Sequence, residues 1–390
     1  MKERKAVKID LFAEAETVRG FDCKGEFSYF LKPSAAFAGE ISALYPSAAG
    51  YDFFAFGGGT LSAVKDGVSR ACAAFSAPPR RAKGTYKGKT CDLFFGDGKM
   101  YADDGAAGET VNGVAGGAVE DEFLRMQVKF DGEKICLSAP FEPTEYSVSE
   151  GGAEFVPYGG AGEILGVKQA GGKLFAVGER GAWRCSYAGD DTETDLAFLP
   201  FPTEGIVKES LQSCGEEMIF LTRAGRLCSF GGQAVKELVR EVKINGELFS
   251  SFADGIYLLA AGKTLFLYDA ETNGYAFCDA GAEISALGGR MLYAGGLFRL
   301  ERKKGGGTVI TRPLDLAESA PKKICRVRFT GTGTASLSLS SEREEKTFPL
   351  RSGEEVFPKM SGRKFVFALS CGEGCRIEEF EAVYTPTGVK

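Results

Sequence analysis

The sequence predicts an all-β protein: a six- or seven-bladed β-propeller followed by a small antiparallel β-sandwich. Three observations lead to this prediction. Glycine and phenylalanine are frequent, with 53 and 31 residues in a chain of 390. A hairpin pattern recurs at intervals of roughly 40 residues, the length of a four-stranded propeller blade. Where that pattern stops, short strands follow in which apolar and polar residues alternate.

The repeat is marked by seven apolar anchor residues in the expected inner strands. Their spacings are 40, 41, 40, 45, 38 and 34 residues, and the anchors are Phe54, Phe94, Ile135, Phe175, Phe220, Leu258 and Leu292. Glycine-containing pairs such as 97–98 and 224–225 lie near them, and glycine accepts the positive φ that tight hairpins require. Packing such units around an axis buries both faces of each sheet and protects the strand edges.

The chain is expected to divide into a propeller over residues 1–307 and a sandwich over residues 308–390. Residues 302–307 are basic and glycine-rich and interrupt the repeat. Five alternating strands are predicted after them, beginning at Ile324, Ala335, Lys346, Lys364 and Ile377. Residues 5–12 also alternate, and we expect this N-terminal strand to be available to complete the last blade and close the ring.

Composition narrows the range of partners. The 47 basic and 53 acidic residues give a formal net charge of −6, which argues against nucleic acid or an anionic membrane as the main partner. We expect no signal peptide and no transmembrane segment, and therefore synthesis in the cytoplasm, because no long apolar run is present. The 11 cysteines are spread singly, as is typical of small core hydrophobes in a reducing compartment.

Histidine is absent from the chain. This excludes Ser-His-Asp and Cys-His nucleophilic systems, histidine acid–base catalysis and histidine metal ligands. Enzymes that rely on carboxylates, lysine, tyrosine or arginine remain possible on this ground alone. The closest cysteine pair, Cys371 and Cys375, has no second pair with which to complete a zinc site.

Two segments look like the end of a phosphate-binding loop. They are residues 88–90 and 262–264, each with the sequence Gly-Lys-Thr. A P-loop also needs glycine five positions before the second glycine, where this chain has Lys83 and Tyr257. Both segments are therefore predicted to be hairpin turns.

Residues 269–274 match the first half of a calcium-binding loop. Asp269, Glu271 and Asn273 supply oxygen atoms at alternate positions, and Gly274 is sixth. The twelfth position of such a loop should be glutamate, but it is Ala280 here. We interpret the segment as a turn in which Asp and Asn side chains cap their own backbone.

Adjacent carboxylates occur four times, at residues 103–104, 190–191, 344–345 and 378–379. Glycosidases use paired carboxylates, so a carbohydrate-cleaving propeller is an alternative to consider. Neighbouring residues on a strand point to opposite faces, however, and we interpret these pairs as solvated turns. The single tryptophan, Trp183, is interpreted as blade packing rather than a sugar platform. We therefore predict no catalytic, cofactor-binding or metal-binding residue, and no cofactor.

The middle of the chain resembles bacteriophage and prophage tail propeller proteins of the head-to-tail stabilisation, hub or nozzle type. One part of the resemblance is a Ser…Pro…aromatic stretch at residues 136–149. A second part lies within residues 158–187, where a Gly-Glu-Ile element is followed by a strand that ends in Glu-x-Gly-x-Trp. Similar blade patterns follow at residues 204–236 and 257–278. The segment from Leu314 onward resembles the C-terminal sandwich of that family. The matched region is about residues 120–385, and the first 120 residues match poorly.

The resemblance implies a non-enzymatic structural protein of a phage or prophage tail. Its partners would be other protein subunits, such as tail, portal or adaptor proteins, or further copies of itself, and it would be virion-associated. Nucleic acid and membrane are not expected as main partners. Two alternatives are a carbohydrate-binding or carbohydrate-cleaving propeller and a cytoplasmic scaffold propeller unrelated to phage.

Overall fold

The computed structural model describes most of the chain and divides it into two compact units. The described residues are 4–9, 11, 15–19, 27–34, 40–114, 116–117, 119, 122–130, 132–157, 162–187, 195–201, 204–244, 246–304, 306–316, 319–372 and 375–387. Unit 1 comprises residues 1–32, 264–280 and 300–390, and unit 2 comprises residues 33–263 and 281–299. No helix among the described residues is long and apolar enough to cross a membrane.

Unit 2 is a succession of antiparallel sheets, numbered one to seven below in chain order. The first two are four-stranded: β4 (Ala43–Tyr45), β5 (Phe53–Gly57), β6 (Thr60–Lys65) and β7 (Val68–Ala74), then β8 (Arg80–Tyr86), β9 (Lys89–Gly96), β10 (Lys99–Asp103) and β11 (Gly108–Asn112). The third contains β12 (Val128–Phe130), β13 (Ile135–Leu137) and β14 (Ala153–Phe155). The short 3-10 helix η1 (Val148–Glu150) lies between β13 and β14 in the chain.

The remaining sheets of unit 2 repeat the same plan. Sheet four has β15 (Ile164–Ala170), β16 (Lys173–Gly178), β17 (Gly181–Ser186) and β18 (Asp195–Pro200). After the 3-10 helix η3 (Lys208–Ser210), sheet five has β19 (Gln212–Cys214), β20 (Glu217–Leu221), β21 (Leu227–Phe230) and β22 (Val235–Val239). Sheet six contributes β23 (Leu248–Ala253) and β24 (Ile256–Ala261), and sheet seven contributes β27 (Ala286–Gly288), β28 (Met291–Tyr293) and the start of β29 (Leu297–Lys304). The protein is thus all-β with several four-stranded antiparallel sheets.

The predicted repeat is confirmed at its anchor positions. Each of the seven anchors lies on the second strand of its sheet, and each has 0% of its surface exposed. Neighbouring sheets share these cores: Phe54 and Phe94 lie in one cluster, and Phe175 and Phe220 in another. The period therefore marks the strand that is buried on both faces.

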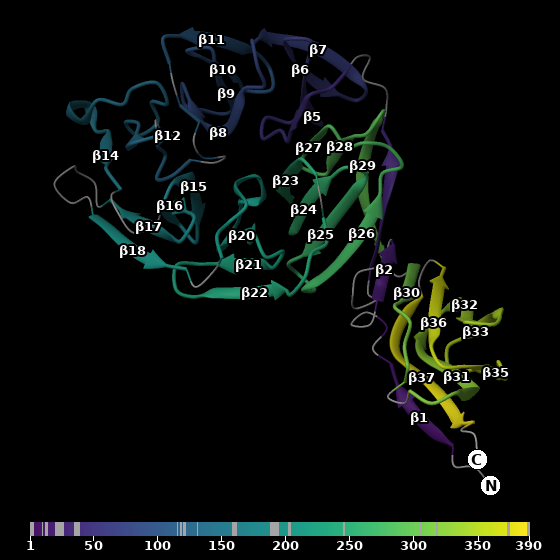
Figure 1. Ribbon diagram of the computed structural model, residues 1–390. Coiled ribbons are helices and arrows are strands. Elements are labelled where there is room, and N and C mark those ends of the chain that lie inside the picture. The colour runs from purple at the N-terminus through teal and green to yellow at the C-terminus, as the bar shows by residue number, and fades with distance from the viewer. Residues whose placement is uncertain are drawn as a thin grey trace. The chain divides into compact units, whose positions relative to one another are not determined.

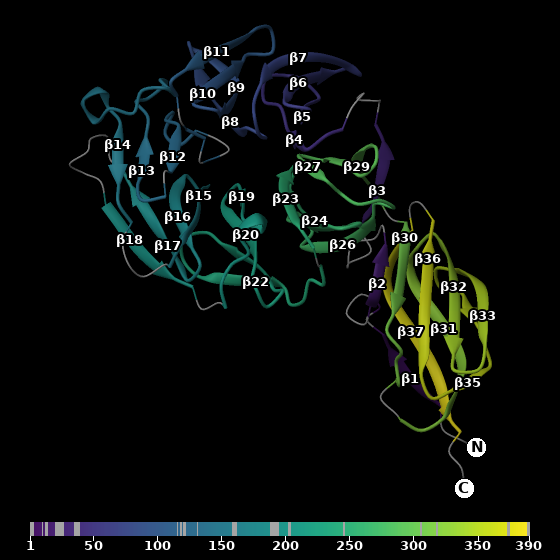
Figure 2. The ribbon, with the colours of Figure 1, turned by 45° about the horizontal axis from the view of Figure 1, so that its top comes forward.

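The first and last sheets of unit 2 share a hydrophobic core. This cluster joins Ile41 and Leu44 to Ala286 and Leu297, and strand β27 contacts both β23 and β4. The two strands come so close that a Cβ on Gly288 would lie 2.0 Å from the carbonyl oxygen of Leu44. Figures 1 and 2 show the sheets of unit 2 following one another in chain order until β27 lies beside β4.

Unit 1 contains two sheets that pack around one core. One is made of β1 (Lys5–Lys8), β37 (Arg376–Pro386), β31 (Lys322–Thr332), β34 (Glu355–Val356) and β35 (Met360–Gly362). The other runs in the order β25 (Thr264–Asp269), β26 (Gly274–Asp279), β2 (Ala15–Arg19), β30 (Gly307–Thr311), β36 (Phe365–Cys371), β32 (Thr334–Ser341) and β33 (Glu345–Arg351). Their shared core includes Phe329 and Phe380 from the first sheet and Leu337 and Phe367 from the second. All five strands predicted after residue 310 are present.

The N-terminal strand has a different partner from the one predicted. β1, within the predicted strand 5–12, pairs with β37 and does not complete the last sheet of the repeat. The physical reason is its apolar face, because Val7 and Ile9 pack into the core of unit 1. The strand that lies beside β29 is instead β3 (Phe27–Pro33). Residues 10 and 12 of the predicted strand lie outside the described residues.

Candidate functional site

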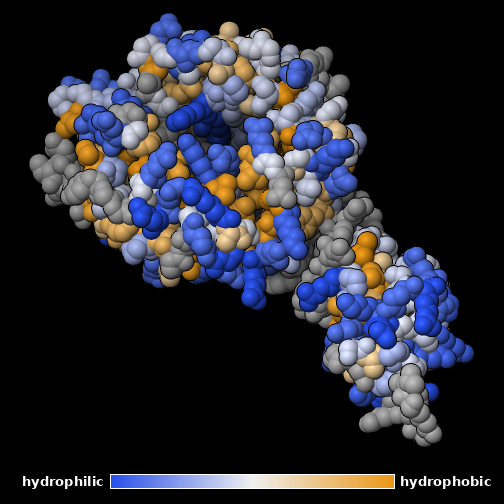
Figure 3. Space-filling view, in the orientation of Figure 1, coloured by the Kyte–Doolittle hydropathy of each residue, from blue (hydrophilic) through white to orange (hydrophobic). Residues whose placement is uncertain are grey.

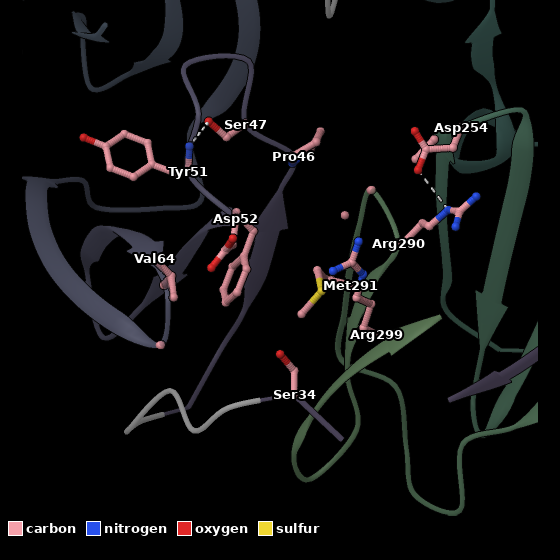
Figure 4. A pocket seen from close by; sticks show the side chains of 15 residues that line it. Ser34, Pro46, Ser47, Tyr51, Asp52, Val64, Asp254, Arg290, Met291 and Arg299 are labelled. Carbon is pink, nitrogen blue, oxygen red and sulfur yellow. Dashed lines mark hydrogen bonds and ion pairs between the residues drawn. The ribbon is translucent and has the colours of Figure 1, made fainter. Parts of the chain in front are cut away.

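A pocket of about 450 Å³ opens at the hairpin turns of sheets one, six and seven of unit 2 (Figure 4). That volume lies in the range of small-molecule sites. Most of its polar side chains come from loops, with Arg299 on strand β29, and the buried apolar side chains of Phe53, Val64 and Met291 come from strands. The residues that carry its chemistry are Ser34, Asp52, Asp254, Arg290, Met291 and Arg299.

Two equivalent turns hold an ion pair at one side of the pocket. Asp254 is in the turn between β23 and β24 with φ of 50°, and Arg290 is in the turn between β27 and β28. Nε of Arg290 lies 3.1 Å from Oδ2 of Asp254, with 21% of the arginine side chain and 72% of the aspartate side chain exposed. An ion pair this exposed contributes little to stability, so it orients the guanidinium more than it holds the fold.

Arg299 brings a second positive charge to the pocket. It lies on β29 directly opposite Met291 of β28, and it is exposed. Within the described part of the chain, its guanidinium has no hydrogen bond or ion pair. Asp52 is also exposed, and its Oδ2 accepts a hydrogen bond of 2.8 Å from the backbone N–H of Asp66. An unpaired arginine fork in a cavity is suited to a carboxylate or phosphate ligand.

A pair of buried carboxylates lies in the neighbouring sheet. Asp92 on β9 and Asp103 on β10 are direct cross-strand partners, and both are fully buried. Like charges placed directly opposite one another are unfavourable unless each is compensated. Each of the two carboxylates is compensated by its own arginine, Arg81 for Asp92 and Arg70 for Asp103.

Asp92 fastens a loop of sheet one to sheet two. Its carboxylate accepts hydrogen bonds from the Ser47 hydroxyl at 2.8 Å and from the N–H groups of Ala48 and Ala49 at 2.9 and 3.0 Å. Arg81 donates to the other oxygen from Nη2 at 2.7 Å. Both oxygens are occupied, so this carboxylate has a structural role.

Asp103 makes a second link of the same kind. It accepts hydrogen bonds from the hydroxyls of Tyr51 at 3.1 Å and Tyr101 at 2.7 Å, from the N–H of Gly105 at 2.9 Å and from Arg70 at 2.6 Å. Burial, together with the negative charge of Asp103, raises the pKa of Tyr51 to about 12. The tyrosine therefore stays a neutral donor, and both oxygens of the Asp103 carboxylate are occupied by hydrogen bonds.

The lysine-containing turns lie where the sequence analysis expected them. Lys87 and Gly88 form the turn between β8 and β9, and Lys89 begins β9. Lys89 forms an ion pair with Asp104, and the hydrogen bond from Lys89 lowers the pKa of that carboxyl. Gly262 and Lys263 form the turn after β24. Neither segment is a strand-to-helix loop that could cradle a phosphate.

The calcium-like segment is also a turn, and it lies in unit 1. Oδ1 of Asp269 accepts hydrogen bonds from the N–H groups of Glu271 at 2.9 Å and Thr272 at 3.3 Å. Asn273 has a φ of 54°, and Asp269 itself is fully buried. Among the described residues no group of three His, Cys, Asp or Glu side chains could hold a metal ion.

The remaining acidic pairs do not converge. Glu344 forms an ion pair with Lys346 at 2.9 Å, and Glu379 forms one with Lys8 at 2.8 Å. Glu345 accepts a hydrogen bond from a serine hydroxyl, and Glu378 is exposed. The pair at 190–191 lies outside the described residues.

Trp183 and several of the described cysteines, such as Cys185, pack in the cores of the sheets. Trp183 is half-buried on β17 and lies with its ring centroid 5.0 Å from that of Phe198, as predicted. Burial raises the pKa of the Cys185 thiol to about 12, so it remains protonated. In unit 1, a hydrogen bond with the Cys375 thiol raises the pKa of Cys371.

Two adjacent turns before and within sheet three expose large apolar side chains. Leu124 and Phe141 are 53% and 52% exposed, and both have left-handed backbones, with φ of 52° and 64°. The turns touch, because the N–H of Phe141 donates to the carbonyl of Arg125 at 2.8 Å. We call Leu124, Arg125, Phe141 and Glu142 the twin-turn surface. Elsewhere, the face of unit 2 in Figure 3 is a mixture of hydrophilic residues and separate hydrophobic patches.

Sequence reasoning missed both Asp92 and the arginines of the pocket. Asp92 stands within an apolar run beside Leu93 and Phe94, and a charged residue inside a buried strand was the available signal. Arg290 and Arg299 carried no such signal, because the pocket is assembled from three repeats that are distant in the sequence.

No protein-family model matches the sequence, and no curated protein matches it. Similar solved structures share little identity with the chain. PorZ, a surface component of the type-IX secretion system of Porphyromonas gingivalis, is 12% identical with a TM-score of 0.41, over 82% of this chain and 46% of PorZ. BamB from Moraxella catarrhalis is 10% identical with a TM-score of 0.41, over 70% of this chain and 99% of BamB.

A third similar structure is the extracellular domain of the putative one-component system BT4673 from B. thetaiotaomicron. It is 10% identical with a TM-score of 0.44, over 90% of this chain and 58% of that domain. The chain thus spans less than half of the length of PorZ. At scores this low, the likenesses carry no argument about fold or function.

Proposed function

We propose that the chain is a non-enzymatic β-propeller protein with a C-terminal β-sandwich, and that it docks another protein through the twin-turn surface. The observation that carries the proposal is the pair of exposed apolar residues, Leu124 and Phe141, on left-handed turns. Such turns favour Asn and Gly. A bulky residue in this conformation costs about 1–2 kcal/mol, and such strain clusters at functional sites.

The charges around the surface indicate what kind of partner fits. Glu142 and Glu145 are exposed on the turn that carries Phe141, whereas the nearby Arg125 is paired with Glu122 at 3.6 Å. An apolar centre with an acidic rim is complementary to an apolar pocket with a basic rim. The partner is therefore a protein with a basic docking surface.

The propeller architecture is part of the proposal. The core shared by sheets one and seven supports a closed ring, since closure protects the strand edges that an open array would expose. Seven anchors on seven second strands favour seven blades over six. The two packed sheets of unit 1 support the sandwich.

The role in a phage or prophage tail rests on the sequence resemblance alone. Residues 136–149, which carry part of that resemblance, include Phe141 of the twin-turn surface. Genes for portal and tail proteins beside this gene, and co-purification of the protein with particles, are the results expected of a tail component. Its absence from purified particles would contradict the tail role and leave the docking proposal standing.

The docking proposal is tested with a variant that keeps the turn but removes the apolar side chains. Leu124→Asn and Phe141→Asn replace two bulky residues with one that tolerates positive φ. A photo-crosslinking residue placed at position 124 or 141 of the parent chain identifies the partner, which is then purified. We expect the double variant to fold as well as the parent chain and to lose its affinity for that partner in binding assays. Val68→Thr changes another exposed apolar residue, 71% exposed, and is the matched control. Unchanged partner affinity in the double variant would overturn the proposal.

A further inference from the structure

The pocket at sheets one, six and seven contains two arginines whose binding capacity the fold leaves largely unused. Arg290 uses only Nε toward Asp254, and within the described residues its two Nη groups have no acceptor. Arg299 has no partner at all within that part of the chain. Figure 4 shows Arg299 and Met291 on one side of the pocket and Asp52 and Val64 on the other. The cavity thus presents unsatisfied guanidinium donors from the turn between β27 and β28 and from strand β29.

The charges of the residues that line the pocket favour a ligand with a single negative charge. Arg290 and Arg299 are balanced by Asp52 and Asp254, so the lining has no net charge. A phosphate or sulfate with two negative charges would meet both aspartates as well as both arginines. A single carboxylate can occupy the unpaired fork of Arg299 and leave the acidic side chains to accept hydrogen bonds.

The other lining groups fit hydroxyls and a ring face. Asp52 uses Oδ2 for the backbone of Asp66 and keeps Oδ1 for a ligand donor. The Ser47 hydroxyl is already occupied with Asp92, so it adds little. Below the polar rim, Phe53, Val64 and Met291 are 3%, 5% and 8% exposed and give an apolar floor.

We propose that this pocket binds a small polyhydroxylated carboxylate of the hexuronic acid type. The carboxylate lies against the guanidinium of Arg299, with Arg290 as the second donor. The sugar hydroxyls donate to the free carboxylate oxygens of Asp52 and Asp254. The ring lies on the apolar floor. No covalent step is involved, and the site is separate from the twin-turn surface.

Binding is measured by calorimetry on the full chain, with D-glucuronate, D-glucose and inorganic phosphate as probes. We expect glucuronate to bind more tightly than either of the other two, because only it combines a carboxylate with the hydroxyls and apolar face of a sugar ring. Arg299→Gln should weaken glucuronate binding about tenfold or more, the usual effect of losing a charged hydrogen bond. Arg240→Gln, which changes another exposed arginine outside the pocket, should leave binding unchanged.

Three outcomes would overturn the inference. They are equal binding of glucose and glucuronate, tighter binding of phosphate, and full retention of glucuronate affinity in Arg299→Gln. Fluorescence of Trp183 checks that each variant is folded. If Arg299→Gln is unstable, Arg290→Gln is the second variant, and it should weaken glucuronate binding because it removes the second guanidinium donor to the carboxylate.

Discussion

Removing the buried carboxylate of Asp92 should destabilise unit 2 more than any change to an exposed charge. In Asp92→Ala, the guanidinium of Arg81, whose side chain is 12% exposed, loses its counter-charge. The N–H groups of Ala48 and Ala49 lose their acceptor at the same time. Removing one partner of a buried ion pair costs about 3–5 kcal/mol. That is a large part of the roughly 5–15 kcal/mol by which a domain is stable.

Three further variants set the scale of this effect. Ser47→Ala removes a single hydrogen bond to the same carboxylate and should cost about 1 kcal/mol. Glu109→Ala removes an exposed ion pair with Lys87, in which the side chains are 51% and 63% exposed, and should change the free energy of unfolding less than Ser47→Ala does. Arg81→Met leaves the carboxylate buried without its cation and should cost nearly as much as Asp92→Ala.

Urea unfolding followed by tryptophan fluorescence measures these losses in unit 2. The chain has one tryptophan, Trp183, and it lies in that unit. The double variant of Asp92 and Arg81 should be less destabilised than the sum of the single variants, with a coupling of about 0.5–3 kcal/mol. The reasoning is refuted if Asp92→Ala costs no more than Ser47→Ala, or if the two single losses add.

Three other predictions test the close approach of β27 to β4, the twin-turn surface and the hydrogen bond of Tyr51 to Asp103. Gly288→Ala places a Cβ 2.0 Å from the carbonyl oxygen of Leu44 and should cost about 1–3 kcal/mol in urea unfolding. Gly166→Ala, in the same unit, would place its Cβ no closer than 3.9 Å to another atom and should cost little. Leu124→Asn should raise the midpoint of thermal unfolding, because it relieves a strained φ of 52°; a lower midpoint would show that Leu124 is needed for the fold. The pKa of Tyr51 in the folded state is raised to about 12 from 10.0. The contribution of this shift to the free energy of unfolding is therefore complete below pH 10 and is lost as pH rises toward 12. Tyr51→Phe should therefore reduce the loss of stability between those pH values, measured as urea midpoints.

The repeat was predictable because its signal is local. A buried inner strand with a glycine turn gives the same pattern each time, so Phe94 and Phe220 could be aligned without knowledge of their contacts. The alternating strands of unit 1 were predictable for the same reason. Alternation identifies a strand and its apolar face, but it does not identify the neighbouring strand. For that reason residues 5–12 were correctly predicted to contain a strand, whereas the pairing considered for it, with the last repeat, differs from its observed pairing with β37.

The sites were less predictable because they depend on pairing between distant segments. The pocket needs Asp52, Asp254 and Arg299 together, and no two of them share a hairpin. The buried acid pair depends on the register that places Asp92 opposite Asp103. The strained turns at Leu124 and Phe141 are hidden because those residue types give no sign of a positive φ.

The pairing of β1 with β37 has a consequence for the order of assembly. Unit 1 is made of three separate stretches of chain, and most of unit 2 is synthesised between the first and the second of them. Residues 5–8 must therefore wait for residues 381–384 before they gain their strand partner. The sheets of unit 2 can form as they leave the ribosome, because each hairpin joins neighbours in sequence. Folding of unit 1 should thus be the late event, and a chain that stops before β31 should have a formed unit 2 and an unpaired N-terminal strand.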